Sequence, residues 1–107
     1  MKKFSDQLAE LPNSDHVQKI ELYLPDGSLE GSIENKPGSQ GSVRVYQYLA
    51  QQFGSINPQA AKKGLEIYAE HTQDAEQNPG KHPNIDRLLN LLEDEQALSV
   101  KVTENTL

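Results

Sequence analysis

The chain has 107 residues, a formal net charge of −6 at pH 7 and no cysteine. Its length is typical of one domain, and its acidity argues against nucleic acid or an anionic membrane as partner, since both require basic residues to neutralise phosphates. The lack of cysteine excludes disulfides, thiolate metal sites and cysteine nucleophiles. We expect one folded domain over residues 1–107.

The first residues, MKKFSDQ, include two lysines but no apolar run behind them, so they do not resemble a signal peptide. No apolar stretch approaches the roughly 20 residues that a membrane-spanning helix needs. We therefore expect a soluble protein of the cytoplasm.

The N-terminal third predicts a short helix followed by a β-hairpin. Phe4, Leu8 and Leu11 have helical spacing before a proline. Residues 17–24 and 29–34 alternate between apolar and polar, and the Pro-Asp-Gly-Ser turn between them favours a hairpin. The side chains expected to point inward are Ile20, Leu22, Leu24, Leu29, Gly31 and Ile33.

Three longer helices are predicted next. Ser42 is the expected N-cap of the first, which ends before Gly54. Asn57-Pro58 opens the second, which we expect to reach about Glu76, and Asn78-Pro79-Gly80 breaks it. The third continues to an acidic end at residues 93–95. The apolar stripes of the first and third are Tyr46, Leu49, Ala50 and Phe53, and Ile85, Leu88, Leu89 and Leu92.

A last strand is predicted from the alternation of Leu98, Val100 and Val102. It should join the hairpin, because an isolated strand is not stable. The order helix, strand, strand, three helices, strand differs from the regular alternation of a doubly wound sheet. We therefore predict an α+β fold, in which a three-stranded antiparallel or mixed sheet is packed by three main helices and a short N-terminal helix.

One candidate site is the loop ENKPGSQGSV, which includes Lys36, Ser39 and Ser42. Glycines let backbone N–H groups approach a ligand, and the start of a helix attracts anions. The loop therefore resembles a cradle for phosphate or carboxylate, to which Lys81 and His82 would add donors if the chain brings them near. The simpler interpretation is a strand-to-helix connector, since turn chemistry alone explains Pro, Gly and Ser.

A second candidate is a set of two imidazoles and two carboxylates. His71 and Asp74 share a helix face, and His82 and Asp86 are four residues apart across the next helix start. If the intervening loop folds back, they would suit a divalent metal such as Zn²⁺, Mn²⁺ or Fe²⁺, or act as general acid and base. No tight metal motif is present, and the simpler interpretation places Asp74 on a solvated face and Asp86 in a favourable first turn.

The stretch NPGKHPNID raises a narrower question. Its Asn, Pro and Gly residues end one helix and start another, and Asp86 suits the first turn of the second. Lys81 and His82 are required by neither a turn nor a cap. Serine catalysis would need Ser39 or Ser42 to pair with His82, which requires the two loops to converge.

The segments IENKPGSQGS, GLEIYAEHTQDAEQNPGKHPNIDRLL and LSVKV resemble a family of small bacterial proteins of unknown function. The resemblance extends from the N-terminal helix to the last strand and includes both loops. It implies a stand-alone bacterial cytoplasmic protein. It implies no activity, cofactor, partner or catalytic residue.

Three functions remain open at this stage. The first is a binding or interaction protein without catalytic activity, whose partner is another protein or a small anionic ligand. The second is a small enzyme that uses a divalent metal or a phosphate ligand at the four His and Asp residues and the 35–42 loop. The third is an acidic mimic of nucleic acid that binds a basic protein. Both a monomer and a homodimer are compatible with the sequence.

Overall fold

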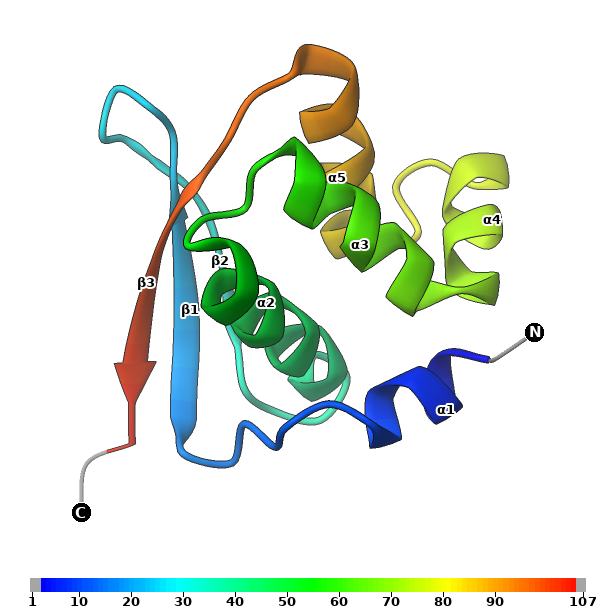
Figure 1. The fold of residues 1–107 in the computed structure, drawn as a ribbon, viewed down its shortest axis with the longest axis horizontal. Helices are drawn as coiled ribbons and strands as arrows, with labels where there is room; N and C mark the ends of the chain where they lie inside the picture. Colours follow the sequence, from blue (N-terminus) through cyan, green and yellow to red (C-terminus); the bar gives the residue numbers. More distant parts are fainter. Residues whose placement is uncertain (1–2, 106–107) are drawn as a thin grey trace.

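The computed structural model describes residues 3–105, which form an open three-stranded sheet with five helices on one side (Figure 1). This is the predicted α+β fold. The elements are α1 Phe4–Ala9, β1 Val17–Tyr23, β2 Leu29–Glu34, α2 Gln40–Phe53, α3 Pro58–Tyr68, α4 Glu70–Gln77, α5 Pro83–Asp94 and β3 Ser99–Glu104.

The sheet has the order β2-β1-β3, and both pairings are antiparallel. The last strand therefore joins the hairpin as predicted, and the sheet is antiparallel rather than mixed. Ile20 of β1 lies opposite Ile33 on one side and Val102 on the other. Residues directly opposite each other share a face, so these three side chains lie on the face that the helices pack against, although Val102 on the edge strand β3 is 38% exposed.

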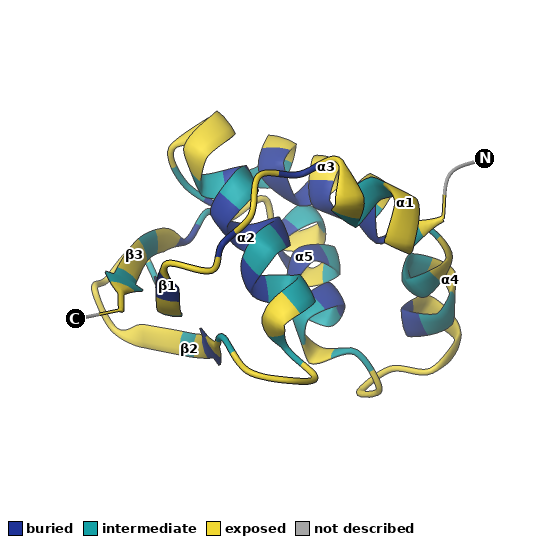
Figure 2. Ribbon diagram, turned by 90° about the horizontal axis from the view of Figure 1, so that it is seen from below, coloured by how far each residue is buried: buried dark blue, intermediate teal, exposed yellow. Residues whose placement is uncertain are grey.

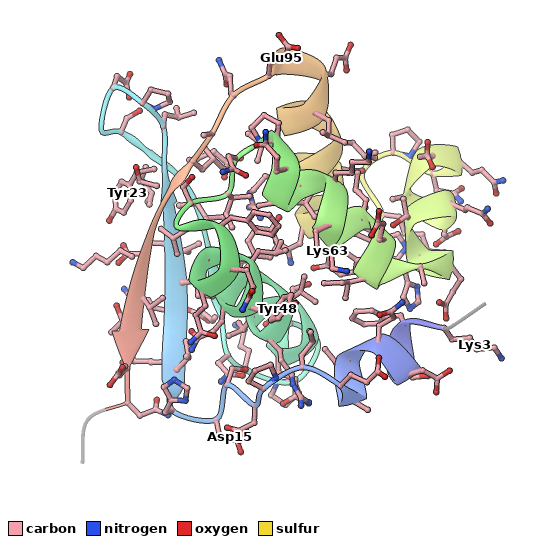
Figure 3. All side chains as sticks on the ribbon, in the orientation of Figure 1. Lys3, Asp15, Tyr23, Tyr48, Lys63 and Glu95 are labelled. Carbon is pink, nitrogen blue, oxygen red and sulfur yellow. The ribbon has the colours of Figure 1, made fainter. Side chains whose placement is uncertain are left out.

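The two faces of the sheet differ in composition, as the alternation in β1 predicts. Ile20 and Leu22 are fully buried beneath the helices, which lie on that side of the strands (Figure 2). Tyr23 points away from the helices (Figure 3), and its hydroxyl donates to the Glu21 carboxylate at 3.2 Å. The outer face is therefore polar, and the core lies between sheet and helices.

The predicted inward set of the hairpin is wrong at Leu29, whereas Leu24 packs against the core as predicted. The register shifts beside Leu22 and Tyr23, because β2 has one extra residue there: Leu22 pairs with Gly31 but Tyr23 pairs with Leu29, and Glu30 is skipped. Because paired residues share a face, Leu29 turns outward with Tyr23 and is 54% exposed. Leu24 lies past the end of the strand and is half-buried.

The predicted apolar stripes of α2 and α5 are partly wrong. Tyr46, Leu49, Ile85 and Leu88 are buried as expected, but Phe53 at the end of α2 is exposed. Phe53 is the last residue of α2, and Gly54 directly after it turns the chain in a left-handed conformation at φ 80°. Additional core residues that the stripes did not predict are Val43, Val45 and Leu91.

The predicted helix over residues 58–76 is wrong, because it breaks into α3 and α4 at Ala69. This residue has φ 52° and ψ −117°, a conformation that a residue with a Cβ rarely adopts. The Thr72 hydroxyl donates to the carbonyl of Leu65 at 2.6 Å, which satisfies an acceptor left free at the end of α3. The break turns α4 so that its one buried residue, Ala75, packs into the core. Residues 3–105 thus form four main helices instead of three.

The predicted N-cap at Ser42 is also wrong, because α2 begins three residues earlier than the expected N1 position. Ser39 is the N-cap residue, although its hydroxyl donates to the carbonyl of Glu34 at 2.5 Å instead of accepting from the helix. The start of α3 is confirmed: the side-chain oxygen of Asn57 accepts from the N–H of Ala60 at 2.8 Å, and Pro58 is the first helical residue.

Candidate functional site

The two loops that the sequence singled out converge on one cavity of about 400 Å³. The start of α2 forms one wall, and the loop between α4 and α5 forms another. The remaining walls come from α1 and from the junction of α3 and α4. The lining residues are Phe4, Gly38, Gln40, Gly41, Ser42, Tyr68, His71, Lys81, His82, Pro83, Asn84 and Ile85.

Two of the predicted anion-binding residues lie outside this cavity. Lys36 is exposed, and its ammonium nitrogen lies 2.8 Å from the carboxylate of Glu34, the last residue of β2. The Ser39 hydroxyl donates to the backbone carbonyl of the same Glu34. The Glu34 ion pair raises the pKa of Lys36 and lowers that of Glu34. Lys36 and Ser39 therefore fasten the loop to β2, whereas Ser42, Lys81 and His82 line the cavity.

The first turn of α2 presents backbone donors at the cavity. Of its first four N–H groups, that of Gln40 donates to Lys36 and that of Val43 donates to Ser39. Within the part of the chain that the structure describes, the N–H groups of Gly41 and Ser42 have no acceptor. Both residues line the cavity, so two donors at the positive end of the helix dipole are available to a ligand.

A series of rings lines the side of the cavity opposite α5. Phe4 stacks on Tyr68 with ring centroids 5.2 Å apart and meets His71 edge-on at the same distance. His71 in turn lies 5.7 Å from the His82 ring. Tyr68 is almost fully buried, which raises its pKa, and its hydroxyl donates to Ser42 Oγ at 2.7 Å. That bond leaves the hydroxyl hydrogen of Ser42 free to donate to a ligand.

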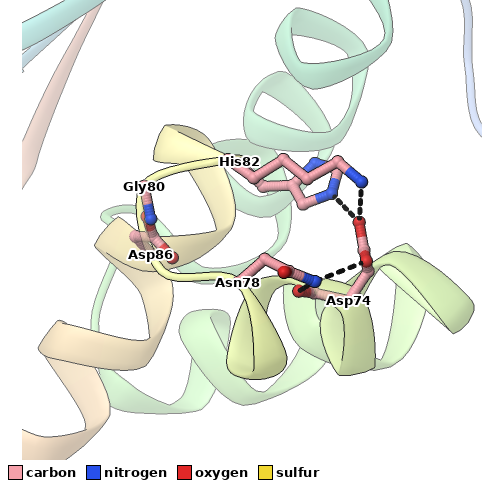
Figure 4. A network of polar contacts seen from close by, with 6 residues as sticks. Asp74, Asn78, Gly80, His82 and Asp86 are labelled. Carbon is pink, nitrogen blue, oxygen red and sulfur yellow. Dashed lines mark hydrogen bonds and ion pairs between the residues drawn. The ribbon is translucent and has the colours of Figure 1, made fainter.

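Asp74 organises the corner of the site (Figure 4). Its Oδ2 lies 2.6 Å from His82 Nε2 and 3.0 Å from Lys81 Nζ, and its Oδ1 accepts from the Asn78 side chain at 3.0 Å. The hydrogen bond from His82, then that from Lys81, lowers the pKa of Asp74 to about 2. A carboxylate only accepts, so Nε2 of His82 carries the hydrogen and Nδ1 is the nitrogen that remains for a ligand.

Asp86 does not join this corner. Its carboxylate turns to the other side of the loop, where Oδ2 accepts from the N–H of Gly80 at 2.9 Å (Figure 4). The structure thus brings His71, Asp74 and His82 near one another but not Asp86. Among residues 3–105, no group of three or more His, Cys, Asp or Glu side chains is arranged to hold a metal ion. The geometry does not support the predicted four-residue metal set.

A buried network behind the cavity fixes the start of α5. The Tyr46 hydroxyl donates to the carbonyl of Asn84 at 2.5 Å, and Arg87 contacts the Tyr46 hydroxyl at 3.3 Å and the Asn84 side chain at 2.8 Å. Arg87 Nε donates to the Glu30 carboxylate at 2.8 Å. Burial raises the pKa of Tyr46 to about 12. The network holds Asn84, and with it one wall of the cavity, against α2 and β2.

Sequence reasoning missed Phe4, Tyr68 and Asn84 as parts of this site. Phe4 and Tyr68 read as core positions, and only the docking of α1 brings Phe4 to the cavity. In the docked position the Glu70 carboxylate accepts from the N–H of Phe4 at 2.7 Å across 66 residues of chain, and the Phe4 ring stacks on Tyr68. No local spacing indicates such a contact. Asn84 had a local signal, its place beside Pro83, but this indicated only a helix start.

The fold and the cavity define a small α+β protein with one polar-aromatic pocket beside a helix start. Residues 4–102 match the family described as "Uncharacterized protein conserved in bacteria (DUF2322)", and the chain belongs to this family. No curated protein and no solved structure shows a match. In residues 3–105, no helix combines the length and apolar character that crossing a membrane requires.

Proposed function

We propose that this bacterial protein is a binding protein without catalytic activity, and that it takes a small organic anion in the cavity beside α2. The observation that carries the proposal is the charge of the lining. The chain has 16 acidic and 10 basic residues, yet the lining contains Lys81, His71 and His82 and, among the described residues, no carboxylate. A cavity free of carboxylates in an acidic protein favours an anionic ligand.

The cell compartment and partners are part of the proposal. We place the protein in the cytoplasm and expect neither nucleic acid nor membrane as a partner, because the net charge of −6 repels both. A second protein could read the occupied state of the cavity. A monomer and a homodimer both leave this proposal intact, since the cavity is complete within one chain.

The proposal is tested by a titration that follows backbone amides by NMR. A panel of small organic anions and their neutral isosteres is added to the protein. The anions should shift the amide signals of Gly41, Ser42 and Lys81, and the neutral isosteres should not. Lys81→Gln should weaken anion binding, whereas Lys63→Gln should not, because Lys63 is an exposed lysine on α3 (Figure 3). Equal shifts from anions and isosteres would reject the proposal.

The contact between Asp74 and His82 favours a second candidate, general acid–base catalysis at His82. A carboxylate that holds one ring nitrogen at 2.6 Å orients the imidazole and leaves the other nitrogen to exchange a proton with a substrate. This arrangement needs no metal. It also agrees with a phosphate-ligand enzyme that uses the start of α2.

This second candidate is tested with p-nitrophenyl phosphate and p-nitrophenyl acetate as probes. Turnover by the protein should fall strongly in His82→Gln and less in Asp74→Asn, in which the imidazole keeps a hydrogen-bond partner. If neither probe is turned over, or if His82→Gln is as active as the unaltered protein, general acid–base catalysis on these ester classes is rejected.

A further inference from the structure

We infer that the ligand of this cavity is a planar aromatic phosphate monoester, with its phosphate at Lys81 and the first turn of α2 and its ring against Phe4 and His71. The inference rests on the proposed function, which states only that the ligand is a small organic anion. It adds two independent requirements, one for each end of the ligand, and each can fail while the other holds.

The phosphate end follows from the number and type of donors. The Lys81 ammonium uses one hydrogen for Asp74 and is 61% exposed, so it has further hydrogens to donate. Ser42 offers its hydroxyl hydrogen and its N–H, and Gly41 offers its N–H. A phosphate monoester presents three terminal oxygens, each able to accept more than one hydrogen bond, and so satisfies more of these donors than a carboxylate.

The charge at this end is set by side chains from two segments of the chain. Lys81 and His82 come from the loop before α5, and His71 comes from α4. Asp74 is the carboxylate nearest to them, but it does not line the cavity and its oxygens are already bonded to Lys81, His82 and Asn78. A dianion in the cavity therefore faces the cationic side of this ion pair.

The aromatic end follows from the ring wall that adjoins the first turn of α2, where a Cβ on Gly41 would lie 3.6 Å from the Phe4 ring and Tyr68 donates to Ser42. Phe4, Tyr68 and His71 form a contiguous series of rings at centroid distances of 5.2 Å, and Pro83 and Ile85 add apolar surface to the same cavity. Ring walls favour a planar π system over a saturated group of equal size, because offset-stacked and edge-on contacts add to the area buried. A volume of about 400 Å³ accommodates both ends at once.

The test compares four probes by NMR titration: phenyl phosphate, cyclohexyl phosphate, inorganic phosphate and benzoate. Phenyl phosphate should bind more tightly than cyclohexyl phosphate by about two- to tenfold, the range that a favourable aromatic contact provides. Inorganic phosphate should shift Gly41, Ser42 and Lys81. Benzoate should bind more weakly than phenyl phosphate because it offers fewer acceptor oxygens.

Two variants test the aromatic end and the phosphate end of the ligand separately. Phe4→Leu should reduce the preference for phenyl over cyclohexyl phosphate to near one, while both still bind. The retained binding of cyclohexyl phosphate shows in the same titration that the cavity has not collapsed. Lys81→Gln should weaken all three phosphates, with Lys63→Gln as the matched control on an exposed face.

The outcomes distinguish this inference from the proposed function. Equal affinity for phenyl and cyclohexyl phosphate, or tighter binding of benzoate than of phenyl phosphate, would overturn the aromatic phosphate while leaving an anion-binding cavity. If none of the four probes shifts Gly41, Ser42 or Lys81, the inference fails together with its premise for these anion classes. A preference for phenyl phosphate that survives Phe4→Leu would also overturn the assigned ring position.

Discussion

Helix α5 is held at two places by opposite means. At its middle, Leu88 packs against Gly64 of α3 so closely that a Cβ on Gly64 would lie 2.7 Å from the Leu88 side chain and 2.9 Å from that of Leu49. At its start, Asn84 and Arg87 are held by hydrogen bonds to Tyr46 and Glu30. The first contact is specified by volume and the second by donors and acceptors. Only the contact at the start of α5 includes a side chain, that of Asn84, that also lines the cavity. The middle of α5 therefore serves the stability of the fold, whereas its start also shapes the candidate site.

The largest loss of stability is expected from adding a side chain at Gly64, where α3 and the middle of α5 are in close contact. Gly64→Ala places a methyl group into a fully packed interface, and such overpacking costs about 1–3 kcal/mol. The gain in helix propensity from replacing glycine offsets part of this cost. Chemical denaturation measures the free energy of unfolding. Adding Leu88→Val should recover part of the loss; if the double variant is less stable than Gly64→Ala alone by the full cost of a cavity, the clash does not lie at Leu88.

A smaller effect is expected at the start of α5. Tyr46→Phe removes a buried hydroxyl that donates to Asn84 and contacts Arg87, which should lower stability by about 1 kcal/mol. Tyr48→Phe is the matched control on the same helix, because Tyr48 is half-buried and has no hydrogen-bond partner among the described residues. Equal stability of the two variants would show that the network does not hold α5.

The raised pKa of Tyr46 predicts that the stability of the fold depends on pH in the alkaline range. Burial raises the pKa of Tyr46 from its ordinary value of 10.0 to about 12. Above pH 10 the unfolded chain loses the tyrosine proton while the folded chain keeps it, so stability falls as pH rises from about 10 to 12. Burial also raises the pKa of Tyr68, which adds to the fall. Denaturation midpoints between pH 9 and about 11.5 should therefore decline less steeply in Tyr46→Phe.

The lowered pKa of Asp74 predicts that the stability of the fold depends on pH in the acid range. Its pKa is lowered from 3.8 to about 2 in the folded chain, so its contribution to stability is complete above about pH 4 and is lost as pH falls towards 2. Asp74→Asn should flatten this part of the stability curve. The exposed Asp94 at the end of α5 is the control: Asp94→Asn should leave the curve unchanged. Parallel acid limbs for Asp74→Asn and the unaltered protein would contradict the assignment.

The smallest effect is expected at Lys81. Its side chain is 61% exposed and pairs with a carboxylate that is itself 33% exposed, and such pairs contribute little to folding. Lys81→Gln should leave the unfolding free energy within about 0.5 kcal/mol of the unaltered protein. A large loss of stability would place Lys81 among the folding contacts and weaken its assignment to the ligand.

The sequence predicts the elements that local patterns encode. The hairpin follows from alternation in β1 and the turn after it, the last strand from its need for a neighbour, and the start of α3 from Asn57-Pro58. The break at Ala69 had no such signal, since alanine favours a helix and neither proline nor glycine is present. The packing of Ala75 into the core decides it, and that is a contact between distant residues.

The candidate site was predictable in part for the same reason. Lys81 and His82 stood out because no turn requires them, and both line the cavity. Lys36 was equally prominent in the sequence, but it does not line the cavity. Its ammonium nitrogen instead lies 2.8 Å from the carboxylate of Glu34. Phe4 gave no signal as a site residue, because it reaches the cavity through contacts with residues distant in the sequence, Tyr68 and Glu70. The residue types in the loop therefore indicated the chemistry of the site, whereas the packing of α1 against α3 and α4 determined which further residues line it.

The strained break at Ala69 also leads us to expect that α3 and α4 open separately to solvent. Helix α3 buries Ala60, Ala61, Ile67 and Tyr68, whereas α4 buries Ala75 alone. Few buried contacts mean a low free energy of local opening, so amide hydrogens in α4 should exchange with solvent faster than those in α3. His71 and Asp74 belong to this loosely held unit. A ligand in the cavity would therefore slow exchange throughout α4, including at residues that it never touches.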